Sequence, residues 1–195
     1  MTSPNDRYFV LEFEPLVVYH RPPPKLVNHK DLDRDEIEFQ RGEPIAVPVP
    51  IARFLADPKQ ELKDYLFNFP GWQLCSGKLR DALARAEVTN VQYFPAEIIT
   101  KAGKSVSSDY SIANFLGRVK CLDWDKSSYD DTHRADGLVV HIDKLVLDPT
   151  HLQGRKLVRM EENSSVLLVS HGVRRHLEAA GVTGVRFTEA EKFQV

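Results

Sequence analysis

Two stretches of the chain share the same order of apolar and polar positions. Residues 74–97 align with residues 168–191 without a gap, at a constant offset of 94 residues. The matched pairs include Ser76 and Ser170, Arg80 and Arg174, Leu83 and Leu177, Ala86 and Ala180, Val88 and Val182, Thr89 and Thr183, and Val91 and Val185. The alignment predicts two similar structural units; the alternative is a coincidence between two common helix-to-strand transitions.

Each copy predicts a strand, a helix and a second strand. A serine follows a short apolar run, and it suits a helix N-cap because its oxygen accepts a hydrogen bond from a free amide of the first turn. In the second copy, Val173, Leu177 and Ala180 lie at i, i+4 and i+7, and Gly181 offers the left-handed C-cap conformation. Residues 182–187 then predict a strand. We expect the helical leucines of the two copies to be equivalent and buried.

Patterns elsewhere predict further elements. Residues 7–13 and 166–169 suit strands, and residues 138–147 form a strand-like run. Residues 58–69 predict a short amphipathic helix with proline at its first position, and residues 111–119 predict another helix. Together these elements predict an α+β fold in a single domain of residues 1–195, with a mixed sheet and flanking helices.

Composition and charge narrow the class of protein. Hydrophobic residues make up 42% and charged residues 28% of the 195-residue chain, which is typical of a globular domain. The net charge of −2 gives no broad attraction for nucleic acid or anionic lipid. No segment approaches the roughly 20 apolar residues of a spanning helix, and the N-terminus lacks a signal-peptide pattern. We therefore expect a cytoplasmic protein without nucleic-acid or membrane binding.

Candidate catalytic and metal-binding residues are sparse. Cys75 and Cys121 lie in apolar surroundings and are expected to be reduced, packed thiols, with a disulfide between them as the less favoured alternative. Ser170 precedes His171, but a nucleophile elbow has glycine two residues before the serine, where this chain has Leu168. The N-cap interpretation of Ser170 is favoured, and we expect no catalytic residue, cofactor or metal site.

An acidic run at residues 123–131 begins like a calcium-binding loop. It offers oxygens at its first, third and fifth positions, but the sixth is Ser128 in place of glycine and the twelfth is Arg134 in place of glutamate. Its Asp-x-Asp pattern could instead hold a metal in a sugar-nucleotide transferase, but no phosphate-binding glycine loop accompanies it. We expect a solvated turn that binds no metal tightly.

A second acidic run, residues 31–38, lies in a proline-rich and charge-rich segment. Residues 20–50 hold three consecutive prolines and are expected to form an irregular surface excursion. Most acidic runs are solvated faces, but such a segment can also steer a basic partner. The partner-binding candidates are Asp31, Asp33, Asp35 and Glu36, followed as second choice by Asp123 and Asp125.

Several motifs taken in order carry a family likeness. They are residues 8–13 (YFVLEF), 79–83 (LRDAL), 91–95 (VQYFP), 110–114, 119–123 (VKCLD) with Ser127 and Tyr129, 142–148 (IDKLVLD) and 181–187 (GVTGVRF). With this order and spacing, the chain resembles the immunity protein eleven family of bacterial polymorphic toxin systems, formerly a domain of unknown function. The likeness covers most of the chain. The segments at residues 20–50 and 58–70 depart from the short form of that family.

The resemblance implies a protein that protects its own cell by binding a cognate protein toxin, and it supplies no catalytic motif to carry over. This is the first function hypothesis, and it requires an exposed surface with aromatic or acidic anchors. The alternative is an enzyme of unrecognised type that reverses a toxin's modification. Its only candidate cluster is Asp123, Asp125 and His141.

Overall fold

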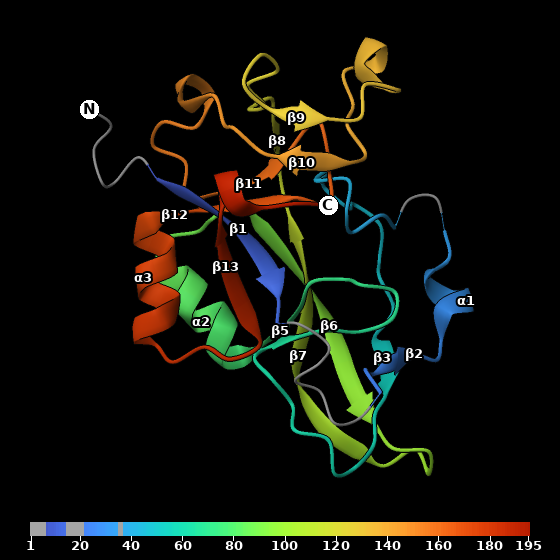
Figure 1. Ribbon diagram of the computed structural model, residues 1–195. Helices are drawn as coiled ribbons and strands as arrows, with labels where there is room; N and C mark the ends of the chain where they lie inside the picture. The colour runs from blue at the N-terminus through green and yellow to red at the C-terminus, as the bar shows by residue number, and fades with distance from the viewer. Residues whose placement is uncertain (1–6, 15–21, 35–36) are drawn as a thin grey trace.

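The computed structural model describes residues 7–14, 22–34 and 37–195, which form two mixed sheets around a pair of helices (Figure 1). Sheet A contains, in spatial order, β13 (Val185–Glu189), β1 (Tyr8–Phe13), β12 (Leu167–Ser170), β11 (Leu157–Met160) and β8 (Arg118–Val119). Sheet B contains β2 (Lys25–Leu26), β3 (Ala52–Leu55), β6 (Val91–Ile99), β7 (Ser105–Phe115), β5 (Leu74–Ser76) and β4 (Tyr65–Leu66). A separate small sheet pairs β10 (Ile142–Lys144) with β9 (Ser128–Tyr129). The predicted α+β class with mixed sheets is confirmed.

The described α-helices are one short helix and two longer ones. These are α1 (His29–Leu32), α2 (Gly77–Arg85) and α3 (His171–Ala179). Three 3-10 turns, η3 (Arg134–Asp136), η4 (Pro149–His151) and η5 (Ala190–Lys192), lie in the connecting segments. None of the helices in the described part of the chain is long and apolar enough to cross a membrane.

The two predicted strand-helix-strand units are present, as β5-α2-β6 and β12-α3-β13. Each serine caps its helix: the Oγ of Ser76 accepts a hydrogen bond from the amide of Leu79 at 3.2 Å, and the Oγ of Ser170 accepts one from Val173 at 3.4 Å. The hydroxyl groups satisfy amides that the first turn leaves without an intrahelical partner. The N-cap interpretation of both serines is confirmed.

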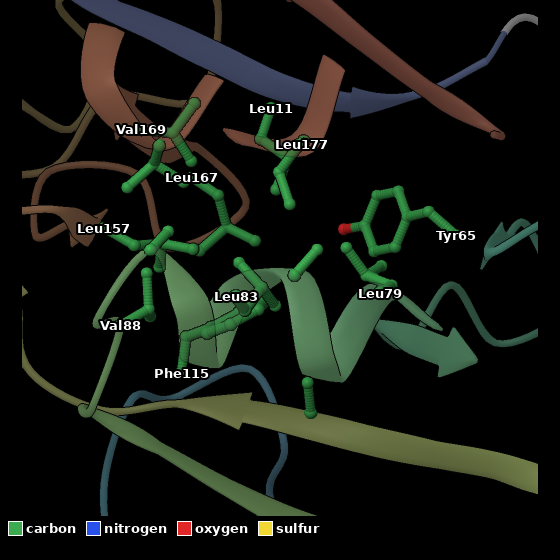
Figure 2. Packing of buried hydrophobic residues seen from close by; sticks show 14 of the residues in the cluster. Leu11, Tyr65, Leu79, Leu83, Val88, Phe115, Leu157, Leu167, Val169 and Leu177 are labelled. Atoms are coloured by element: carbon green, nitrogen blue, oxygen red, sulfur yellow. The ribbon is translucent and has the colours of Figure 1, made fainter. Parts of the chain in front are cut away.

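The two longer helices pack against each other and against the inner faces of both sheets (Figures 1 and 2). Leu83 and Leu177 lie at equivalent positions in this inner core and are only 1% and 0% exposed. Figure 2 shows them converging with Leu11, Tyr65 and other side chains between the sheets. The prediction that the helical leucines are equivalent and buried is confirmed.

The likeness between the two units extends to strands that the sequence alignment did not include. A middle strand, β7 or β1, lies antiparallel to both strands of each unit, and a neighbouring strand, β4 or β11, extends each sheet. The hydroxyl of Tyr110 donates to the carbonyl of Lys63 at 2.8 Å, and that of Tyr8 donates to Arg155 at 2.6 Å. We call residues 63–116 the first half of the framework, and residues 155–190 together with 7–14 its second half.

Each sheet also has an outer face, covered by a largely irregular segment. The first outer layer, residues 22–50 without 35 and 36, packs over sheet B, and the second outer layer, residues 120–152, packs over sheet A. Residues 20–50 were expected to form a surface excursion. The described part of this segment is irregular over most of its length, yet Leu32, Ile37 and Phe39 are buried against sheet B.

Three of the expected local structures are wrong or incomplete. Residues 58–69 form turns and the short strand β4 in place of a helix. Residues 111–115 belong to β7, and residues 118–119 form β8. Of the strand-like run at 138–147, only β10 is a strand. In both mistaken helices, the apolar side chains divide between the inner core and an outer face, whereas an amphipathic helix would direct them to one side.

Candidate partner-binding surfaces

The first acidic run lies in the first outer layer. Asp31 belongs to α1 and is exposed, and its carboxylate accepts a hydrogen bond from the side-chain amide of Asn28 at 3.3 Å. Asp33 is exposed directly after α1. Asp35 and Glu36 lie outside the described residues. The structure therefore places two of the four first-choice acids at one end of a single turn of helix.

A groove of about 510 Å³ opens beside α1. Its apolar lining includes Leu32, Phe69 and Trp72, and Phe69 is 53% exposed. Its charged lining residues among those described are Lys25, Arg34, Asp33 and Glu38, together with His29. The described charges around the groove are therefore evenly divided between the two signs.

Asp123 and Asp125 lie in the second outer layer, in the loop before β9. The Asp123 carboxylate accepts hydrogen bonds from the backbone amide of Lys126 at 3.2 Å and from its ammonium group at 2.6 Å. The bond from the Lys126 ammonium is the main reason that the pKa of Asp123 lies below its usual value. Asp125 is exposed. The loop folds as a self-contained turn in which Asp123 positions the backbone.

The same loop gathers aromatic and cationic side chains. Trp124 and Tyr129 contact edge to face, with ring centroids 5.1 Å apart. The Arg134 guanidinium lies 5.9 Å from the centroid of each ring. Farther along the layer, Leu138 and Val140 expose 46% and 64% of their surface. The second outer layer thus combines rings held in place with apolar side chains open to solvent.

The cluster expected for an enzyme is divided between separate interactions. Asp123 is paired with Lys126, whereas the ring of His141 lies 3.3 Å from the carboxylate of Asp143. Among residues 7–14, 22–34 and 37–195, no group of three or more His, Cys, Asp or Glu is placed to hold a metal ion.

Other nucleophile candidates are engaged or shielded. Cys75 and Cys121 are free and buried; burial raises the pKa of both thiols, that of Cys121 to about 12. Neither is a thiolate at neutral pH, so neither can act readily as a nucleophile. The hydroxyl of Ser170 serves as a helix cap.

Sequence reasoning did not single out Phe69, Trp72, Arg134, Leu138 or Val140. Phe69 was assigned to a helix, Leu138 and Val140 were assigned to a strand, and Trp72 was given no element, so their places beside a groove or loop were not predicted. The signal for Arg134 was its position after two aromatic residues in an acidic loop. Arginine and aromatic residues are enriched among side chains that dominate binding at protein interfaces.

Comparison with known families gives one match that spans nearly the whole chain. The sequence profile of the immunity protein family Imm11 matches residues 8–192. A comparison with curated proteins finds no match. The matched range includes both halves of the framework and both outer layers, and the chain therefore belongs to the immunity protein family Imm11.

Proposed function

We propose that this protein neutralises a cognate bacterial toxin by binding it directly, in the cytoplasm of the cell that makes both. The observation that carries the proposal is the match of the Imm11 family to residues 8–192. Immunity by direct binding needs an exposed surface with anchoring side chains. The second outer layer offers such side chains at Arg134 and Val140, and the groove beside α1 offers Phe69.

Binding is favoured over an enzymatic reversal of toxin damage because three of the candidate reactive groups, Asp123 and the two cysteines, are paired or buried. Asp123 holds a turn through Lys126, and the two thiols are buried. A general acid or base must instead reach a substrate atom within hydrogen-bonding distance. We therefore assign no catalytic residue and propose that protection is stoichiometric.

The experiment titrates the purified toxin encoded by the adjacent gene with this protein and follows the toxin's activity. A direct neutraliser should abolish activity near one equivalent, and the two proteins should elute together in size-exclusion chromatography. Full protection at about one hundredth of an equivalent, without a stable complex, would instead support an enzyme. An unrelated toxin of similar charge serves as the control, and it should remain active.

A further inference from the structure

The second outer layer carries an apolar patch that faces solvent. Val140 is the most exposed of the large hydrophobic side chains described, at 64%, and Leu138 is 46% exposed. Between them, Val139 is buried, and its amide donates to the carbonyl of Glu162. The backbone is therefore held in place while the two apolar side chains on either side remain open. Exposed apolar patches on a folded domain often mark interaction sites.

The charges around this patch are mainly negative. Residues 123–144 contain six aspartates and three lysines or arginines. The ammonium of Lys126 is paired with Asp123 at 2.6 Å. Five further carboxylates are exposed, at Asp125, Asp130, Asp131, Asp136 and Asp143. A partner with a cationic surface would be attracted to this region, and one with an anionic surface would be repelled.

The loop that bears the aspartates is also held in a defined conformation. Ser127 accepts a hydrogen bond from the amide of Val146 and donates one to its carbonyl, at 3.0 and 3.1 Å. The packing of Arg134 against Trp124 and Tyr129 orders the opposite side of the loop. A surface that is already ordered loses less conformational entropy when it binds.

We propose that residues 123–144, the β9–β10 surface, form the contact for the toxin, and that the toxin presents a cationic protein surface around an apolar site that receives Val140 and Leu138. This inference rests on the proposed function and adds the location and the partner's chemistry. This reverses the order suggested by the sequence, which ranked the acids near α1 first. The groove beside α1, which Asp33 lines, is the weaker candidate because its described charges are evenly divided and select no sign in a partner.

Two sets of variants test the surface against the toxin encoded by the adjacent gene. Leu138→Ser with Val140→Ser removes the apolar contact, and Asp125→Asn, Asp131→Asn and Asp136→Asn remove exposed charge. We expect the first set to raise the Kd at least about tenfold, mainly through faster dissociation. The second set should slow association about tenfold at low salt and flatten its salt dependence.

Matched variants in the first outer layer and directly after it serve as controls. Val27→Ser with Ile51→Ser alters apolar side chains that are 43% and 46% exposed, and Asp31→Asn with Asp33→Asn removes acids beside α1. Both controls should leave the Kd and the association rate within about twofold. All variants are compared by thermal unfolding, where their exposed positions predict almost no change.

The outcomes distinguish this inference from the function on which it rests. A wild-type chain that forms no complex with the toxin overturns both. A wild-type complex whose affinity is unchanged by the variants in residues 123–144 overturns only the location of the surface. Loss of binding in the control variants would move the interface to the surface around α1 and the first outer layer.

Discussion

The first half of the framework takes its middle strand from the adjoining chain, whereas the second half takes it from the other end of the sequence. β7 follows β6 in a hairpin, but β1 precedes the rest of its half and pairs with β12 and β13 from the C-terminal region. The local contacts are nevertheless the same. The amide of Ser76 donates to the carbonyl of Asp64, and that of Ser170 donates to Lys156. Strand order and caps, more than connectivity, define this arrangement.

The halves differ where they meet. Asp64 binds the backbone amide and hydroxyl of Thr183, in the loop after the other half's helix. Its counterpart Lys156 pairs with Glu87, also in the loop after the other helix. The Asp64 side chain is 14% exposed, whereas those of Lys156 and Glu87 are 38% and 79% exposed. Equivalent positions thus carry opposite charges. The more buried contact, that of Asp64 with Thr183, should contribute more to the stability of the fold.

The largest effect should come from the equivalent leucines of the inner core. Leu83→Ala and Leu177→Ala each remove a fully buried side chain, and we expect each to lower the free energy of unfolding by about 2–5 kcal/mol. Urea denaturation at neutral pH measures both. If the two losses of unfolding free energy differ by more than about twofold, the two leucines do not contribute equally to the inner core.

Arg159 provides a second comparison, because the equivalent position in the first half is Phe67. Arg159 is 0% exposed, and one nitrogen donates to the carbonyl of Ser164, but its Nε and Nη2 have no hydrogen-bond partner among the described residues. Burial lowers the pKa of Arg159 to about 10, so the side chain remains charged at neutral pH. A buried charge with unpaired donors destabilises the folded state.

We therefore expect Arg159→Met to raise the free energy of unfolding by about 1–3 kcal/mol at pH 7. Because the folded pKa lies below the unfolded value, the destabilisation is fully present below pH 10 and fades above it. Urea denaturation at pH 7 measures the gain. Arg118→Met, which alters an exposed arginine on the neighbouring strand, is the control and should change stability little. A destabilised Arg159→Met variant would contradict the comparison.

The repeat within the sequence was enough to predict the units containing α2 and α3, because Ser76 and Ser170 cap helices through local contacts. It could not reveal that β1 corresponds to β7, since the order of the chain separates that strand from its unit. The helix expected at 58–69 failed for a related reason. Tyr65 and Leu66 suit one helical face, yet they alternate along β4, with Tyr65 in the inner core and Leu66 against the first outer layer.

The candidate surfaces were predictable only in part. The acidic runs are visible in the sequence. The mismatches between residues 123–131 and a calcium-binding loop favoured a simple turn there. Exposure of Val140 depends on how residues 120–152 lie across sheet A, which is a tertiary property that no local pattern encodes. Burial of Phe39 against sheet B has the same origin.

The contact between the halves at Asp64 should have an intermediate effect. Burial by itself would raise the pKa of Asp64, but hydrogen bonds from Ser76 and Thr183 outweigh it and hold the pKa below its usual value. We expect Asp64→Asn to cost about 1–2 kcal/mol of unfolding free energy at pH 7. Because the folded pKa is depressed, this contribution is present above the unfolded pKa and is lost as pH falls through the folded value.

Acid titration of stability measures that dependence. The wild type should lose stability more steeply than Asp64→Asn as the pH falls from about 5 to 3. Glu87→Gln changes the exposed counterpart pair and should have a smaller effect at neutral pH, since exposed ion pairs contribute little. Parallel curves for the wild type and Asp64→Asn would show that Asp64 does not link the halves through its charge.

The smallest expected effect concerns the residue that follows the C-cap of each longer helix. Glu87 has φ +57°, in the left-handed region, and the equivalent Gly181 has φ +62°. A side chain is disfavoured there, whereas glycine adopts the conformation freely. Glu87→Gly should therefore melt about 2–4 °C above Glu87→Ala, which loses the same ion pair with Lys156 but keeps a Cβ. Gly181→Ala should lower Tm by a similar amount. Equal melting temperatures for the two Glu87 variants would show that the first helix does not need glycine where the second one has it.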